Sequence, residues 1–84
     1  MEKWPITVRF IPPNEGGRKT LPDTRDYRLV AWWDQAFRSC RLTSNGYEFG
    51  AWCHASIQFL VPIKELPEKF DLCEGARVVA RARS

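Results

Sequence analysis

The chain is poor in the residues that most often bind metals or act as nucleophiles, with one histidine and three cysteines among 84 residues. His54 directly follows Cys53, and neighbours on a strand point to opposite faces, so the two cannot act as base and nucleophile. No two cysteines have the short loop spacing of a zinc site, although three cysteines and a histidine could in principle converge. We therefore expect no metal, no cofactor and no catalysis. An enzyme with a Cys53 or Glu74 nucleophile is a remote alternative.

Long apolar runs are also missing, and every apolar stretch is far shorter than the roughly 20 residues of a membrane span. Cys40, Cys53 and Cys73 are odd in number, and no secretory leader precedes them. These features predict three free thiols in a reducing compartment. We expect a soluble, cytoplasmic protein that makes no contact with a membrane.

A phosphate-binding loop of the nucleotide-binding type is excluded as well. Gly16 and Gly17 are followed by Arg18-Lys19-Thr20 and then by Leu21-Pro22. The P-loop needs a longer glycine spacing, with a strand before it and a helix after it. The glycine pair is therefore predicted to form a turn.

What the chain does contain is a sufficient apolar core and a mild excess of positive charge. It is 44% hydrophobic with four tryptophans, enough for one compact domain spanning residues 1–84. The net charge is +3, and nine arginines against four lysines favour planar contacts with phosphate or carboxylate. A charge this small raises the prior for nucleic-acid binding only slightly.

Alternating apolar and polar residues predict β-strands along most of the chain. The clearest case places Trp4, Ile6, Val8 and Phe10 on one face. The pattern also places Val78, Ala80 and Ala82 inward, and Arg77, Val79, Arg81 and Arg83 outward. Further strands are expected at residues 27–33, 38–42, 55–61 and 70–73.

The turns between these strands complete the fold prediction. Asn45-Gly46 indicates a type I′ hairpin, because both residues tolerate positive φ angles. Nothing indicates a long helix. An all-β domain follows, either a small closed antiparallel β-barrel of about six strands or a small sandwich.

Two Glu-Gly turns, each ending in an arginine, lie near the two ends of the chain. The first is Glu15-Gly16-Gly17-Arg18, with Tyr27-Arg28 nine residues further on, and the second is Glu74-Gly75-Ala76-Arg77. In this order the motifs resemble the C-terminal β-barrel, the third domain, of translation elongation factor Tu. The resemblance runs from about Trp4 to the last residue, without the GTPase domain or the middle barrel.

The resemblance implies a closed barrel without catalytic activity. In elongation factor Tu this domain touches the T arm of aminoacyl-tRNA and contacts the nucleotide exchange factor, and Glu74 matches a glutamate that takes part in the tRNA contact. The chain differs from the family at Leu29 and Val30, which replace proline and glutamine. Cys73 and Ala76 replace an arginine and a glycine beside the closing turn.

Two binding functions are therefore expected of a stand-alone barrel. The first is recognition of a protein partner through Trp32 or Trp33, since consecutive residues of a strand cannot both enter one core. The alternative is RNA binding, to tRNA or ribosomal RNA, whereas DNA is not expected. The candidate RNA-binding residues are Arg18, Lys19, Arg28, Glu74, Arg77, Arg81 and Arg83. The alternatives without a binding role are a covering loop over one of the two tryptophans, an ordinary solvated face for the arginines and, for Glu74, an ion pair with Arg18 or Arg77.

Overall fold

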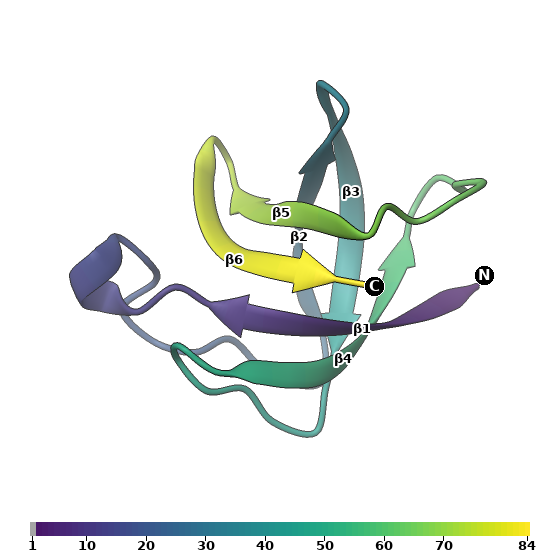
Figure 1. The fold of residues 1–84 in the computed structure, drawn as a ribbon. Helices are drawn as coiled ribbons and strands as arrows, with labels where there is room; N and C mark the ends of the chain where they lie inside the picture. Colours follow the sequence, from purple (N-terminus) through teal and green to yellow (C-terminus); the bar gives the residue numbers. More distant parts are fainter. Residues whose placement is uncertain (1) are drawn as a thin grey trace.

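The computed structural model describes residues 2–84, which form a closed antiparallel barrel of six strands (Figure 1). The all-β prediction is confirmed, and the barrel rather than the sandwich is the architecture. The strands follow one another around the barrel in the order β1-β4-β3-β2-β5-β6. Their bounds are β1 Lys3–Phe10, β2 Tyr27–Trp33, β3 Ala36–Thr43, β4 Trp52–Phe59, β5 Lys69–Glu74 and β6 Arg77–Arg83.

The barrel interior is filled by the apolar residues of the alternating pattern. On β1, Ile6, Val8 and Phe10 are at most 4% exposed, as predicted. Within the described residues no polar or charged side chain is buried. Alternation therefore explains the core, because it sends charged residues to the outer surface and apolar ones inward.

A β-bulge changes which residues of β6 face inward. Leu72 pairs with Ala80, whereas the next residue of β5, Cys73, pairs with Val78. Val79 is the extra residue and is fully buried, so the prediction that it faces outward with the arginines is wrong. Bulges bend the strand that carries them, and β6 curves sharply in Figure 1.

A two-residue hairpin joins β2 to β3 through Asp34 and Gln35. Both residues have positive φ, of 50° and 63°, as a type I′ turn requires. The type I′ turn predicted at Asn45-Gly46 is wrong, because neither residue has positive φ. β3 and β4 do pair antiparallel, but residues 44–51 connect them as a longer loop.

Tyr47 explains why this connection is long. Its side chain is only 7% exposed and its ring lies 4.9 Å from that of Phe10, edge to face. The loop thus closes the barrel with an aromatic ring, which a two-residue turn could not deliver. Ser44 stabilises the loop by donating a hydrogen bond of 2.7 Å to the His54 carbonyl.

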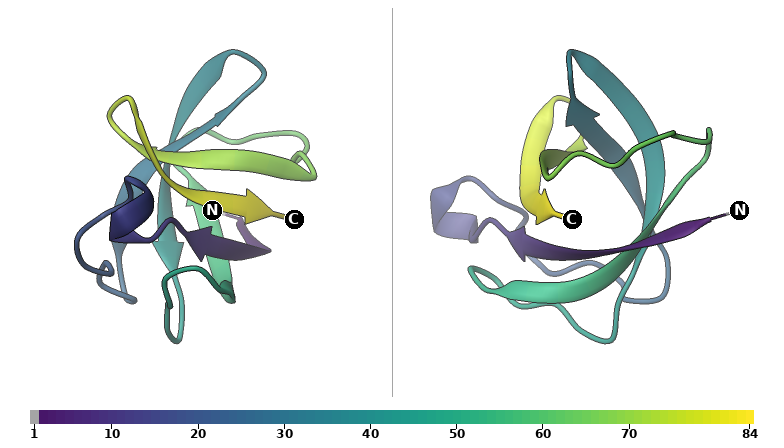
Figure 2. Two further views of the ribbon diagram at one scale, coloured as in Figure 1. Left: turned by 60° about the vertical axis from the view of Figure 1, so that its left-hand side comes forward. Right: turned by 45° about the vertical axis from the view of Figure 1, so that its right-hand side comes forward.

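The first Glu-Gly turn is not a hairpin. A single turn of 3-10 helix, η1 (Pro13–Glu15), ends at Gly16 with φ 92°, in a loop that projects beyond the end of β1 (Figure 2). A Cβ atom on Gly17 would lie 1.7 Å from the Ile11 carbonyl oxygen, so only glycine fits there. The second turn, by contrast, is the predicted hairpin between β5 and β6, in which Glu74 pairs with Arg77.

Candidate functional site

Arg18, Tyr27 and Glu74 meet in a half-buried cluster that joins the two Glu-Gly motifs. The Glu74 carboxylate accepts hydrogen bonds from the Arg18 guanidinium and the Tyr27 hydroxyl. The Arg18 guanidinium also lies 5.1 Å from the centre of the Tyr27 ring and donates a 3.0 Å hydrogen bond to the Thr20 carbonyl. The loop before β2 is thereby tied to the β5–β6 hairpin.

The charges of this cluster are stabilised within the protein. Burial alone would raise the pKa of Glu74, but hydrogen bonds from Tyr27 and Arg18 outweigh it and hold this pKa below its usual value. Burial raises the pKa of Tyr27, and the bond to Glu74 raises it further. At neutral pH the cluster is therefore a carboxylate held between a cation and a neutral phenol.

Arg18 and Glu74 therefore form an ion pair, which is the alternative without a binding role that the sequence predicted for Glu74. Their neighbours Lys19 and Arg77 are exposed and make no ion pair within residues 2–84. The candidate RNA-binding residues near the two turns thus include an engaged pair and two free cations.

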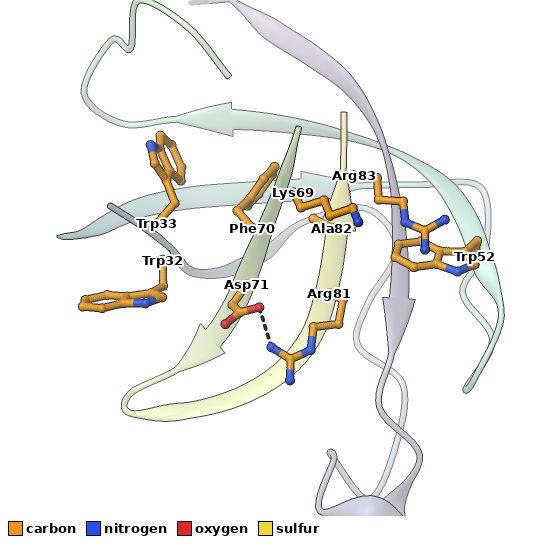
Figure 3. Close-up of a pocket in the computed structure, with 9 residues that line it drawn as sticks. All are labelled: Trp32, Trp33, Trp52, Lys69, Phe70, Asp71, Arg81, Ala82 and Arg83. Atoms are coloured by element: carbon orange, nitrogen blue, oxygen red, sulfur yellow. Dashed lines mark hydrogen bonds and ion pairs between the residues drawn. The ribbon is translucent and has the colours of Figure 1, made fainter. Parts of the chain in front are cut away.

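A second region, which we call the tryptophan groove, is hollowed into the outer wall of the barrel (Figure 3). It has a volume of about 420 Å³. Strands β2, β4, β5 and β6 contribute to it, so its walls come from segments far apart in the sequence. The groove is lined by Trp32, Trp33, Trp52, Lys69, Phe70, Asp71, Arg81, Ala82 and Arg83.

Strand register explains why these side chains share one surface. Trp32 pairs with Asp71, and Asp71 with Arg81. Arg81 pairs with Arg9, and Arg9 with Trp52. Directly paired residues point to the same face of a sheet. One row across five strands therefore carries a tryptophan, an acid, two arginines and a second tryptophan.

Positive charge exceeds negative charge in the groove. Lys69, Arg81 and Arg83 line the groove together with a single carboxylate, that of Asp71, which accepts a 2.5 Å hydrogen bond from Arg81. The Arg83 guanidinium lies over the Trp52 ring, 3.8 Å from its centre. Stacking of this kind leaves the edge of the guanidinium free to donate hydrogen bonds. The groove therefore presents aromatic surface and cationic donors together.

The two consecutive tryptophans of β2 have different surroundings. Trp33 packs edge-on against Phe59 and Phe70, each 5.5 Å away between ring centres. Arg38 covers it at 3.7 Å and donates a 2.7 Å hydrogen bond to its carbonyl. Trp32 lies on the outer side, with its ring centre 4.5 Å from that of Phe37. Trp33 closes the core at one edge of the groove, and Trp32 belongs to the surface.

The candidate RNA-binding residues do not form one surface. Arg81 and Arg83 lie in the groove, whereas Arg18 and Glu74 pair with each other outside it. Arg28 lies on the outer face of β2 at the opposite end from Trp32, with its Nε 3.9 Å from Asp26. Of the seven candidates, two are therefore placed beside a tryptophan.

Trp52, Lys69 and Arg9 are among the residues of this region that sequence reasoning missed. Trp52 and Lys69 lie in the groove, and Arg9 stands beside it in the row. The alternation that predicted a strand at 55–61 also extends back to Trp52, so its outward direction could have been found. Its position beside Arg83 could not, because that depends on the barrel order.

The side chains that commonly bind metals are dispersed over the part of the chain that the structure describes. Residues 2–84 contain no cluster of three or more histidine, cysteine or acidic side chains that could hold a metal. All three cysteines are free thiols. Burial raises the pKa of Cys40 to about 12, and burial also raises that of Cys73, so neither is a thiolate at neutral pH.

No model of a known protein family matches the chain, and no curated protein matches it. Within residues 2–84, no helix combines the length and the hydropathy that crossing a membrane requires.

Proposed function

We propose that the chain is a non-catalytic binding barrel that binds single-stranded RNA in the tryptophan groove. The observation that carries this proposal is the cross-strand row with Trp32 and Trp52 at its ends and Asp71, Arg81 and Arg9 between them. Proteins that hold single strands combine aromatic platforms for bases with cations for the backbone. The groove has both.

The stacking energies and the small net charge of the groove favour a modest affinity for RNA. Each base stacked on an aromatic side chain contributes about 1–3 kcal/mol. Lys69, Arg81 and Arg83 attract phosphates, but Asp71 offsets part of their charge. Two stacked bases and a few phosphate contacts give micromolar binding at low salt, and this binding weakens steeply as salt increases.

The proposal includes similarity to the third domain of elongation factor Tu and a role linked to translation, with tRNA or ribosomal RNA as the source of the strand. Its support is that Arg18, Tyr27 and Glu74, taken from the three motifs that carry the resemblance, contact one another. A cytoplasmic location also belongs to the proposal, because three free thiols suit a reducing compartment.

Fluorescence anisotropy of a short labelled single-stranded RNA tests the proposal. Trp52→Ala should weaken binding by about 5-fold to 150-fold, the loss expected for one stacked base. Arg81→Ala should reduce the slope of log K against log salt by about 0.7. Arg28→Ala removes the same charge outside the groove and serves as the matched control. Absence of RNA binding at low salt, or an equal loss of affinity in all three variants, would refute RNA binding in the groove.

Protein binding is the second candidate function, favoured by an exposed apolar surface next to Trp32. Phe37, Leu60 and Val61 are 55%, 48% and 74% exposed, and Phe37 contacts Trp32. They line a hollow of about 540 Å³. Large exposed apolar side chains in contact mark protein interfaces. Phe37→Ser combined with Val61→Ser should abolish partner binding and leave RNA binding intact, whereas Arg81→Ala should do the reverse.

A further inference from the structure

A polar pocket lies on a different part of the barrel wall, over β1, β4 and β3. It has a volume of about 300 Å³. Strand register places its residues side by side, because Gln58 of β4 pairs with Lys3 of β1 and with Arg41 of β3. In the next row, Ser56 pairs with Thr43. Five polar side chains from three strands therefore line one concave surface.

The groups in this pocket are largely free of partners. The side chains of Lys3, Thr43, Ser56 and Gln58 make no hydrogen bond or ion pair within residues 2–84. Arg41 makes one ion pair, with its Nε 3.3 Å from Asp26 Oδ1, and this Nε is shielded from solvent without a well-aligned hydrogen bond. Shielded polar atoms without partners are uncommon in folded proteins. The other polar side chains of the pocket are exposed or half-exposed and remain available to a ligand.

The charge of the pocket identifies the chemistry of its ligand. Lys3, Arg25 and Arg41 line it with a single carboxylate, that of Asp26. Arg25 forms an ion pair with Asp23, with 3.7 Å between its Nε and Asp23 Oδ1, and its side chain is 90% exposed. An ammonium, a guanidinium and two hydroxyls facing one another match a compact anion with several acceptor oxygens.

We propose that this pocket binds a phosphate group, either free or as a phosphomonoester. Arg41 supplies the planar donor pair, Lys3 the second charge, and Ser56 and Thr43 neutral donors. The site shares no residue with the tryptophan groove, so it is independent of the proposed RNA function. Asp26 opposes the anion, because it competes for Arg41 and adds negative charge at the rim.

Two-dimensional ¹H-¹⁵N NMR titration tests the site with inorganic phosphate and with adenosine 5′-monophosphate as separate probes. The expected result is saturable shifts of the amides of Lys3, Arg41, Thr43 and Ser56 with at least one probe. Saturation by inorganic phosphate assigns the site to the free anion. Saturation by the nucleotide alone assigns it to a phosphomonoester.

Variants separate this site from general charge attraction. Arg41→Ala should weaken binding by about tenfold or more, as for loss of a charge-assisted hydrogen bond, and Ser56→Ala by a few-fold. Arg77→Ala, at an exposed arginine outside both the polar pocket and the tryptophan groove, is the matched control and should change affinity less than about twofold. Asp26→Asn should tighten binding, because it removes the competing carboxylate. The proposal is overturned if neither probe shifts these amides, if Arg41→Ala binds as wild type does, or if Asp26→Asn weakens binding.

Discussion

The Arg18 cluster and the tryptophan groove use the same residue types for opposite purposes. In the cluster, Arg18 and Glu74 satisfy each other and are held by Tyr27. In the groove, Arg83 stacks on Trp52 and keeps its hydrogen-bonding edge available. An arginine that is engaged on all sides contributes to stability, whereas one that rests on an aromatic face remains available to a ligand.

The number of arginines in a sequence therefore does not locate a binding surface. Arg18 and Arg83 belong to one candidate set in sequence, yet their surroundings assign them different roles. If the assignment is right, substitutions near the cluster should change the free energy of unfolding and leave RNA affinity unchanged. Substitutions in the groove should do the opposite.

The largest effect on stability is expected at Gly17, in the loop that carries Arg18. Gly17→Ala would place a Cβ atom 1.7 Å from the Ile11 carbonyl oxygen, so the loop must move and release Arg18 from Glu74. We expect a loss of about 3 kcal/mol or more, the upper range for overpacking. Urea denaturation followed by tryptophan fluorescence measures it. Gly46→Ala is the control, since nothing lies within 4 Å of its Cβ position. Equal stability of the two variants would contradict the tight approach at Gly17.

Trp33→Ala compared with Trp32→Ala separates core from surface within two consecutive residues. Trp33 contacts Phe59, Phe70 and Arg38, so its removal should cost about 2–4 kcal/mol, somewhat less than for a fully buried tryptophan. Trp32→Ala should cost about 1 kcal/mol or less in stability and weaken RNA binding by about 5-fold or more. The two measurements are denaturant midpoint and anisotropy. A larger loss of stability in Trp32→Ala would reverse the assignment.

Strand alternation accounts for most of what the sequence predicted correctly. It placed Ile6, Val8 and Phe10 inside and sent Trp32 and Trp33 to opposite faces, because a period of two is local information. It failed at Val79, where one extra residue reverses the pattern. A bulge depends on how two strands pair, so the sequence of either strand alone does not predict it.

The site was less predictable than the fold, because its contacts span the barrel. Arg18 and Glu74 are 56 residues apart, and the sequence left open whether Glu74 pairs with Arg18 or with Arg77, because neither turn shows which arginine is near in space. The turn at Asn45-Gly46 failed for a related reason: Tyr47 is needed against Phe10, and burial of that ring outweighs the local turn preference. Long-range packing decided both cases.

Removing the Glu74 charge should produce a smaller, pH-dependent change in stability. Glu74→Gln leaves the partly buried Arg18 without its counter-ion, which we expect to cost about 1–2 kcal/mol at pH 7. The pKa of Glu74 is lowered from its usual value by Tyr27 and Arg18, so its contribution to stability is present above the unfolded-state pKa and is lost as pH falls through the folded-state pKa. Wild type and variant should therefore converge in stability at low pH. Denaturant midpoints from pH 7 down to acid test this, and a difference that persists in acid would exclude the ion pair as its cause.

The smallest effect on stability is expected at Asp71, whose exposed ion pair with Arg81 contributes about 0–1 kcal/mol. Asp71→Asn keeps the shape of the side chain but removes the only carboxylate among the residues that line the groove, so RNA affinity should rise a few-fold at low salt. Anisotropy at two salt concentrations measures the gain, which should shrink as salt increases. The matched variant is Glu48→Gln, which neutralises an exposed acid outside both the groove and the polar pocket. If both variants gain RNA affinity equally, the net charge of the protein attracts the RNA. The groove would then have no binding role that distinguishes it from the Arg18 cluster.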